Sequence, residues 1–496
     1  MKNSEELRQQ LRSINRKSYP AYKGLKGLYH FGNYILSIDH VQGDPFASPS
    51  HVSIQISHRD AGFPVEYYKD TLTGTTLCDY LTRQFEKQVS QYSFRAKGSG
   101  KSGLLTASHC GQEILSRTAC EITEKGITAR FFVGFPANGR TINATELEKI
   151  LFDFLPVCIQ KSFFYSSLNA KELQNYIELA EDQEFIRQTL PAKNLCAFIA
   201  DGSILPRESG ISSRPMKASV PFTSPDSLRI SINLPHKGKI TGMGIPKGIT
   251  LIVGGGYHGK STLLNALELG VYNHIPGDGR EYVITDATAV KLRSEDGRFI
   301  KDVDISMFIN DLPNKKDTRC FSTLDASGST SQAAGIAESI EAGSHLFLLD
   351  EDTSATNFMV RDAFMQQVIQ REKEPITPFL ERAEDLYKKA GISTILVAGS
   401  SGAFFHIADT IIQMDNYVPK DITASVKKLC SQYPLPAVSV TDFQLPHSHR
   451  IMSRPAESSK RLRHNSRGNH SDSGAAKPER LKTRICLLYT SDAADE

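Results

Sequence analysis

The feature that most constrains the fold of this chain is a glycine-rich segment between an apolar run and a helical pattern. Residues 254–262 are Gly-Gly-Gly-Tyr-His-Gly-Lys-Ser-Thr, which fits the spacing G-x-x-x-x-G-K-[ST] of a phosphate-binding loop. The β-branched run at residues 249–253 predicts a buried strand, and residues 261–269 predict a helix. Strand, glycine loop and helix in this order predict a βα unit of a parallel sheet.

This segment predicts a nucleotide site. Consecutive backbone N–H groups of such a loop wrap around phosphates, helped by the partial positive charge at the start of the helix. We expect Lys260 to reach the β- and γ-phosphates and the Ser261 hydroxyl to hold Mg²⁺. The flanking patterns disfavour the alternative, a chance glycine turn. The candidate nucleotide-binding residues are Gly254, Gly255, Gly256, Tyr257, His258, Gly259, Lys260, Ser261 and Thr262.

A second motif follows the apolar run at residues 346–349, which ends in Asp350 and Glu351. A strand end there directs Asp350, together with Ser261, to Mg²⁺ and leaves Glu351 to polarise the attacking water. Glu351 and Lys260 are therefore the candidate catalytic residues. Acidic residues commonly end strands, so this motif gains its weight from lying downstream of Lys260.

A segment between the two motifs resembles the signature of the ABC-class ATPases. Residues 326–332 are Ala-Ser-Gly-Ser-Thr-Ser-Gln and lead into a helical pattern of small residues at 333–342. In that class the signature opens a helix and completes the nucleotide site of the partner protomer. The resemblance implies this role for Ser327, Gly328 and Ser329, and a serine- and glycine-rich linker is the alternative.

Several positions depart from the pattern of that class. Asp352 stands where proline is usual, and Asn357 stands where aspartate is usual. The histidine switch is absent, and a Gly-Ser-Ser segment occupies its place, which makes Ser400 the candidate switch residue. The loop before the signature has no clear glutamine, and Asn310 is the candidate for that position. These departures predict a weaker or rearranged stabilisation of the transition state.

Four segments narrow the resemblance: residues 201–209, 254–264, 274–281 and 326–332. Together they resemble a family of soluble ABC-class ATPases that includes bacterial proteins and a trypanosome mitochondrial RNA-editing-associated protein. The likeness extends from about residue 32 to residue 446. It implies an N-terminal domain, a central ABC ATPase core, a C-terminal domain and a homodimer with a basic pore that can meet RNA.

Two polar details within these segments stay open. The turn at residues 277–280, Gly-Asp-Gly-Arg, either approaches the nucleotide or only reverses the chain. Arg207 and Glu208 form either a surface ion pair, which is the commoner case, or a functional pair.

Composition and pattern along the chain predict its division. The expected fold class is α/β: a P-loop ABC-type ATPase core with a mixed or parallel sheet, preceded by an α+β N-terminal domain and followed by a truncated C-terminal segment. The predicted N-terminal domain, a candidate nucleic-acid-binding domain, covers residues 1–195, the ATPase domain 196–425, and the start of the C-terminal domain 426–449. Residues 450–485 predict a disordered basic tail. Residues 486–496 resemble a translated sequencing adaptor, so we expect the natural C-terminus to be missing.

The charge balance gives little overall attraction for a polyanion, because 58 Lys and Arg residues stand against 55 Asp and Glu residues. A local exception surrounds residues 98–102, Gly-Ser-Gly-Lys-Ser, which lack the first glycine of a phosphate-binding loop. We interpret this segment as a flexible basic loop. Its Arg95, Lys97 and Lys101 either contact a nucleic-acid backbone or form a solvated surface.

Other features predict the compartment. No apolar run reaches the roughly 20 residues of a membrane helix, and the polar start has no signal-peptide segment. The eight cysteines are scattered, which indicates a reducing compartment. We therefore expect a cytoplasmic protein with no membrane span and no stable metal site beyond Mg²⁺.

Taken together, the motifs favour a soluble Mg²⁺-dependent ATPase with ATP and Mg²⁺ as cofactors. We expect a head-to-tail homodimer with composite ATP sites, coupled to the handling of RNA or another nucleic acid. The alternative is a nucleotide-gated switch that binds RNA or protein with little turnover, which the absent histidine switch and Asp352 favour. A transporter ATP-binding subunit fits less well, because the span from Gly254 to Ser327 leaves little room for a transport-coupling helical subdomain.

Overall fold

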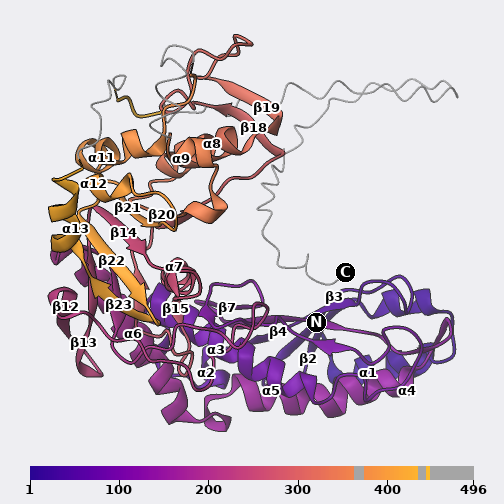
Figure 1. The fold of residues 1–496 in the computed structure, drawn as a ribbon. Coiled ribbons are helices and arrows are strands. Elements are labelled where there is room, and N and C mark those ends of the chain that lie inside the picture. The colour runs from indigo at the N-terminus through magenta and orange to yellow at the C-terminus, as the bar shows by residue number, and fades with distance from the viewer. Residues whose placement is uncertain (362–373, 434–442, 447–496) are drawn as a thin grey trace, which may run out of the picture. The chain divides into compact units, whose positions relative to one another are not determined.

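The computed structural model describes residues 1–361, 374–433 and 443–446 (Figure 1). Four predicted segments lie wholly or partly outside the described residues: 196–425, 426–449, 450–485 and 486–496. The expected domain boundaries therefore remain a proposal.

The N-terminal part is built on a mainly antiparallel sheet. In the described residues its seven strands follow the order β1-β2-β3-β4-β8-β5, and β7 pairs with β8 outside this path. β1 and β2 pair in parallel, and the other neighbours pair antiparallel. Val52, Ile54 and Ile56 alternate along β4 and face the core. The strands are β1 (Lys2–Asn3), β2 (Gly27–His30), β3 (Ile35–His40), β4 (Ser50–Ile56), β5 (Leu105–Thr106), β7 (Cys120–Thr123) and β8 (Gly126–Val133).

Helix α3 (Thr71–Ser90) shows how local sequence positions this core. Asp70 caps its start by accepting a hydrogen bond from the Thr73 backbone N–H at 2.8 Å, and the Thr73 side chain accepts one from the Asp70 N–H. Leu81 and Phe85, four residues apart on one face, are buried against the sheet and its helices. The helix is therefore fixed both at its end and along its apolar face.

The second part contains the sheet that the sequence predicts. Its order is β17-β20-β21-β14-β22-β23, and all neighbours pair in parallel except β22 and β23. Every residue of β20 and β21 is buried, as expected for central strands covered on both faces. The expected mixed α/β core is confirmed. The strands are β14 (Ile249–Val253), β17 (Val290–Leu292), β20 (Leu346–Asp350), β21 (Ser393–Val397), β22 (Thr410–Asp415) and β23 (Val418–Asp421).

A second, antiparallel sheet lies beside this core and was not foreseen from the sequence. Its order is β12-β13-β11-β16, and Ala197 of β11 lies opposite Ile245 on one side and Thr285 on the other. Its strands are β11 (Leu195–Ala200), β12 (Arg229–Leu234), β13 (Gly238–Pro246) and β16 (Val283–Thr285).

Smaller strand pairs and the helices complete the described residues. The strand pairs are β6 (Glu113–Ile114) with β15 (Asn273–His274), β9 (Ala137–Asn138) with β10 (Thr141–Ile142), and β18 (Arg298–Val303) with β19 (Phe321–Ala326). Further helices are α1 (Ser4–Ile14), α2 (His58–Ala61), α4 (Ala144–Glu148), α5 (Leu155–Phe163), α6 (Ala170–Ala192), α7 (Lys260–Leu269), α8 (Gly328–Glu341), α9 (Thr356–Met359), α11 (Phe379–Ala390), α12 (Phe404–Ile407), α13 (Thr423–Cys430) and a π-helical turn at Lys149–Phe154.

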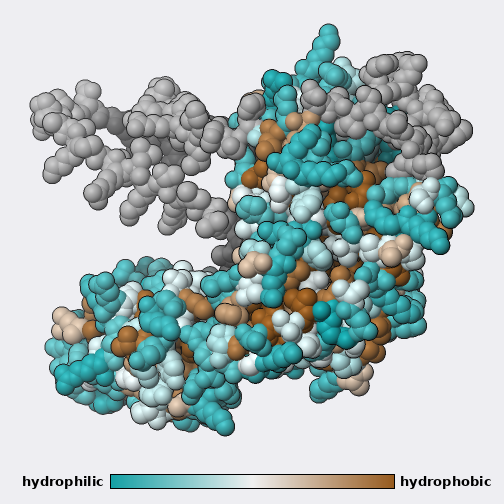
Figure 2. All heavy atoms as spheres, turned by 90° about the vertical axis from the view of Figure 1, so that its left-hand side faces the viewer, coloured by the Kyte–Doolittle hydropathy of each residue, from teal (hydrophilic) through white to brown (hydrophobic). Residues whose placement is uncertain are grey.

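The surface is mixed in polarity. Figure 2 shows one face on which apolar side chains gather in patches between polar ones. Within the part of the chain that the structure describes, no helix combines the length and apolar character needed to cross a bilayer.

Candidate functional site

The loop between β14 and α7 requires glycine at two positions. Gly254 has a φ of +140°, and a Cβ atom there would lie 2.4 Å from the carbonyl oxygen of Met414. Gly259 has a φ of +98°, and its Cβ would lie 3.2 Å from the ring of Tyr417. The loop therefore runs close to β22 and turns directly into α7, whose first residue is Lys260. The free N–H groups of this first helical turn form the predicted anion-binding end.

Lys260 and Ser261 take the expected places at this end of α7. The Lys260 ammonium donates to the carbonyls of Gly254 and Gly255 at 2.8 and 2.9 Å, so it lies over the loop. The Ser261 hydroxyl lies 3.4 Å from a carboxylate oxygen of Asp350, at the end of β20. The sequence separates these two oxygens by many residues, and the parallel sheet brings them together.

The pair of oxygens fits a magnesium ion. Mg²⁺ prefers oxygen ligands at about 2.1 Å in octahedral geometry, which places neighbouring ligands about 3 Å apart. The separation between Ser261 and Asp350 is close to this value. In the described residues no cluster of three or more His, Cys, Asp or Glu side chains could hold a metal ion without further ligands. The two residues fit a site that phosphate and water oxygens complete.

Glu351 is held by the segment that stands in place of the histidine switch. One carboxylate oxygen accepts from the backbone N–H groups of Gly399 and Ser400 at 2.7 and 3.0 Å, and the other accepts from the Ser400 hydroxyl at 2.6 Å. Burial by itself raises the pKa of the Glu351 carboxyl, but these hydrogen bonds outweigh burial and leave the pKa below its ordinary value. The structure thus brings Ser400 and Glu351 into direct contact.

The other predicted loop residues have different surroundings. Tyr257 is 99% exposed, with a φ of +65°. His258 accepts a hydrogen bond from the Asn416 backbone N–H at 2.9 Å, which ties the loop to the turn after β22. Gly256 lies in open space, and Thr262 faces a cavity beside the loop.

That cavity has a volume of about 350 Å³ and a mainly apolar lining. It adjoins the phosphate-binding loop through Gly259 and Thr262. Its apolar walls come from β22, the turn after it, and the segment before β12. These residues are Leu205, Pro206, Met216, Ala218, Val220, Phe222, Met414 and Tyr417. No local pattern in the sequence predicts this cavity, because its walls come from distant segments.

The signature residues border a different cavity. Ser327 caps α8 by accepting from the Thr330 backbone N–H, and the Ser329 hydroxyl donates to the Asn357 side chain at 2.8 Å. Together with Gly328 they line a polar cavity of about 560 Å³. Among the described residues, its lining includes none from 254–262. The structure therefore does not bring the signature and the phosphate-binding loop of one chain together.

Gln332 is a residue of this region that sequence reasoning assigned no role. Its side chain is fully buried, donates to the Ser354 hydroxyl at 3.0 Å and accepts from the Ala355 backbone N–H at 3.0 Å. It thereby joins the signature helix α8 to the segment after Glu351. The sequence carries no signal for this role, because it depends on burial and on partners in another segment.

The hydrogen bonds of Asn310 do not join it to the phosphate-binding loop. Its side chain donates to the Ser306 carbonyl at 2.6 Å, and its backbone N–H donates to the Pro375 carbonyl at 2.9 Å. Its neighbours Ile309 and Leu312 line the signature cavity.

The basic loop is held by hydrogen bonds to distant segments, which corrects the expectation of a flexible segment. The Lys97 backbone N–H donates to the Glu146 carboxylate at 2.9 Å, and the Lys101 N–H donates to the Pro45 carbonyl at 2.7 Å. The Arg95 guanidinium lies 4.8 Å from the centre of the Tyr92 ring. All three basic residues are exposed.

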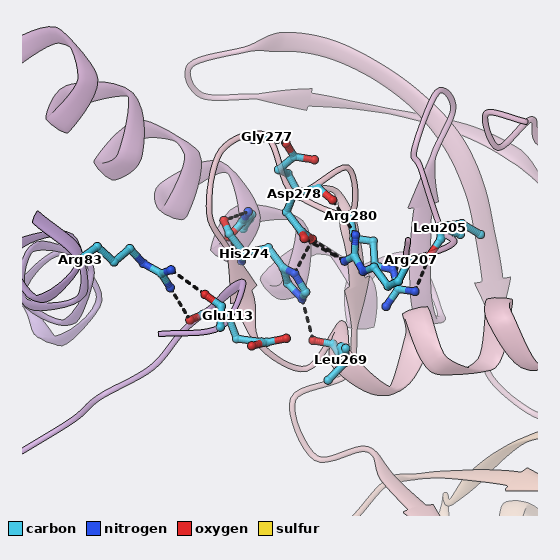
Figure 3. Close-up of polar contacts among 12 residues, drawn as sticks. Arg83, Glu113, Leu205, Arg207, Leu269, His274, Gly277, Asp278 and Arg280 are labelled. Carbon is cyan, nitrogen blue, oxygen red and sulfur yellow. Dashed lines mark hydrogen bonds and ion pairs between the residues drawn. The ribbon is translucent and has the colours of Figure 1, made fainter. Parts of the chain in front are cut away.

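Two open polar details are resolved by the structure. Arg207 pairs with Asp278 at 2.9 Å, so the expected pair with Glu208 is wrong. Asp278 and Arg280 of this turn are buried, and the Asp278 carboxylate contacts the His274 ring (Figure 3). The turn therefore forms an internal polar cluster.

The comparisons with known proteins add family information. The model described as the P-loop domain of ABC ATPases matches residues 169–448, and the model described as the N-terminal region of ATPases of the ABC class matches residues 4–166. An uncharacterised protein of Methanocaldococcus jannaschii is 31% identical over 266 residues, or 51% of this chain and 58% of that protein. This chain thus spans less than two thirds of the relative it matches.

Solved structures show weaker likeness. The ADP conformation of an ATP-binding cassette of an ABC transporter is 13% identical, covers 40% of this chain and 89% of its own, and has a TM-score of 0.26. A part of the cbiONQ ABC transporter complex of Clostridium perfringens is 14% identical, covers 39% of this chain and 86% of its own, and has a TM-score of 0.25. Likeness at this level carries no argument about function.

Proposed function

Because this chain belongs to the family of ABC-class ATPases, we propose that it hydrolyses ATP with Mg²⁺ as cofactor. The observation that carries the proposal is the meeting of three groups at the carboxyl edge of the parallel sheet. Ser261 lies beside Asp350, and the neighbouring Glu351 is oriented by Ser400 and its backbone. Phosphoryl transfer depends on positioning and charge stabilisation of this kind.

Each residue has a separate role in the proposed reaction. Lys260 exchanges its bonds to two loop carbonyls for bonds to the β- and γ-phosphates. Ser261 and Asp350 hold Mg²⁺, which neutralises charge on the phosphates when bound. Glu351, ionised because of its lowered pKa, orients and polarises the attacking water. The apolar cavity beside Gly259 takes the nucleoside.

We further propose a head-to-tail homodimer. Ser327 is exposed, and the signature cavity is separate from the phosphate-binding loop of the same chain. A second copy that presents its loop to this cavity would complete a composite ATP site, and two such sites would form symmetrically.

The proposed partner of the cycle is a nucleic acid, with RNA as the first candidate. Arg95, Lys97 and Lys101 project from one hydrogen-bonded loop of the N-terminal region, which supports contacts to a phosphate backbone. We also propose a cytoplasmic location, because the scattered cysteines of the sequence indicate a reducing compartment.

A nucleotide-gated switch with little turnover is the second candidate. The observation that favours it is the set of three donors on Glu351, which lowers the pKa of the group that should act on water. A transporter subunit is a poorer candidate. Between α7 and α8 the described chain forms strands, including the β18–β19 hairpin, where a transport-coupling helical subdomain would be needed.

Phosphate release by the full chain with Mg²⁺ and ATP, with and without RNA, tests the proposal. We expect turnover that RNA stimulates, and a loss of about a hundredfold in Glu351→Gln with ATP binding retained. Lys260→Ala should lose binding itself. Tight ATP binding by the parent without turnover in either condition would favour the switch, and a Glu351→Gln variant as fast as the parent would exclude the assigned water-polarising residue.

A further inference from the structure

A short strand pair joins the N-terminal domain to the end of the P-loop helix. β6 pairs antiparallel with β15, so that His274 lies opposite Glu113, and the Ile275 N–H donates to the Gln112 carbonyl at 3.0 Å. β15 begins shortly after α7 ends at Leu269. Backbone of the N-terminal domain therefore lies beside the C-terminal end of the helix that carries Lys260 and Ser261.

His274 is the centre of this junction. Its ring is fully buried, and both ring nitrogens face oxygen acceptors: Nδ1 lies 2.7 Å from an Asp278 carboxylate oxygen, and Nε2 lies 3.0 Å from the Leu269 carbonyl (Figure 3). A neutral imidazole has only one N–H and can satisfy only one of these acceptors. In either tautomer the ring lies between the Asp278 carboxylate of its own turn and the carbonyl at the end of α7.

The carbonyl that His274 contacts closes the P-loop helix. The last carbonyls of a helix lack helical partners and carry partial negative charge, so a cation there stabilises the helix end. Arg187 of α6 supplies such a cation, because it donates to the Gly270 carbonyl at 3.0 Å. The far end of α7 is thus held by Arg187 and by the contact with His274.

On the N-terminal side of the junction, Arg83 of α3 holds the backbone around β6. Arg83 of α3 donates to the Gly111 carbonyl at 2.5 Å and to the Glu113 carbonyl at 3.0 Å (Figure 3). The buried Asp79 fixes Arg83 at 2.6 Å and also pairs with Arg117. Helix α3 therefore positions the strand that pairs with His274.

The same cluster reaches the nucleoside cavity. Asp278 pairs with Arg207, and Arg280 donates to the Leu205 carbonyl at 2.8 Å. Leu205 is a wall of the apolar cavity beside the phosphate-binding loop. A displacement at the junction would therefore act on both the end of α7 and a wall of this cavity.

We propose that His274 is a positioning residue that couples the N-terminal domain to the P-loop helix. A shift of residues 111–113 moves β15, and His274 transmits the shift to Leu269 and so to α7. The effect on nucleotide affinity rests on the proposed function, whereas the mechanical connection between α3 and α7 stands independently of it.

Hydrogen exchange of the full chain without nucleotide tests the connection. Arg83→Met should speed exchange of amides at residues 266–272 by about tenfold. In a His274→Gln background, itself faster than the parent, the same change should add little, because the connection is already broken. The matched control is Arg130→Met, which removes an N-terminal arginine that contacts Thr118 and Glu121. It should leave residues 266–272 unchanged.

Two results would overturn the proposal: no response of residues 266–272 to Arg83→Met, or an equal and additive response in the His274→Gln background. If His274→Gln does not fold, the contrast between Arg83→Met and Arg130→Met still decides. In a parallel titration with Mg²⁺ and ATP, Arg83→Met should weaken binding about fivefold, and only where His274 is present. A parent that binds no ATP would refute the proposed function, while the exchange data would still decide the connection.

Discussion

At the scale of single residues, the hydrogen bonds to Glu351 determine how well this carboxylate orients and polarises water in the proposed reaction. A carboxylate that accepts three hydrogen bonds is well oriented but weakly basic. Charge on this group persists as pH falls, because its pKa lies below the ordinary value. The Gly-Ser-Ser segment thus supplies orientation where the class usually places a histidine.

Ser400→Ala tests this orientation. The change removes the shortest of the three hydrogen bonds to Glu351, so we expect kcat to fall about tenfold with KM nearly unchanged. Steady-state phosphate release measures both constants. The matched control is Ser401→Ala, because only the backbone of Ser401 acts on Glu351. Equal effects of the two variants would contradict the assignment.

Asp278 provides a pH-dependent prediction. Burial raises the pKa of its carboxyl, but His274 and Arg207 outweigh burial and hold the pKa below its ordinary value. A carboxyl of this kind stabilises the fold above its unfolded pKa, and the stabilisation is lost as pH falls through the folded value. Asp278→Asn should therefore cost about 3 kcal/mol near neutral pH.

The cost of Asp278→Asn should shrink as the pH falls below the unfolded pKa of about 3.9 and through the lowered folded pKa, where the parent's native carboxylate becomes protonated. Urea unfolding between neutral pH and about pH 2.5 measures this difference between variant and parent. A difference that stays constant over the whole range would show that charge on Asp278 contributes nothing.

At the scale of elements, the buried Gln332 side chain helps to join the signature helix α8 to the segment after β20. Gln332→Leu keeps the size of the side chain but leaves the Ala355 N–H without its acceptor, whereas the Ser354 hydroxyl keeps its bond to the Asp350 carbonyl. We expect a loss of about 2 kcal/mol in the free energy of unfolding, since a part-buried N–H without an acceptor is costly. Urea unfolding checks this, with the exposed Gln174→Leu of α6 as control.

The sequence predicts the elements whose patterns are local along the chain, and it does not predict pairings between distant segments. The strand at residues 249–253 and the helix after it match β14 and α7, because periodicity and the glycine loop are local. The β11–β13–β16 pairings and the β6–β15 pair join distant segments and leave no local pattern. The predicted flexibility of the basic loop is wrong, because its backbone partners lie elsewhere in the chain, where no local pattern shows them.

The same distinction holds within the candidate site. The types and spacing of Lys260, Ser261 and Asp350 indicate their chemistry, so these residues can be predicted from the sequence before the fold is known. His274 and Gln332 could not be nominated, because their importance comes from burial and from acceptors on other elements. Motifs therefore reveal groups that meet ligand more readily than groups that hold the site together.

At the scale of the whole molecule, the proposed head-to-tail dimer makes a prediction that no single chain could satisfy. Lys260→Ala removes the phosphate-binding group, and Ser327→Arg fills the signature cavity, so each variant alone should form only defective sites. In a mixed dimer, one composite site carries both defects and the other carries neither.

An equal mixture of the two inactive variants should therefore regain roughly a quarter of the parent's ATPase rate, since half of the random dimers contain one intact site of two. Phosphate release measured against the mixing ratio gives this value, with its maximum at equal amounts. The control mixes Lys260→Ala with Glu351→Gln, two defects on the same side of the composite site. There the mixed dimer places one defect in each site, so no activity should return. Recovery in the control, or none in the test mixture, would contradict the head-to-tail arrangement.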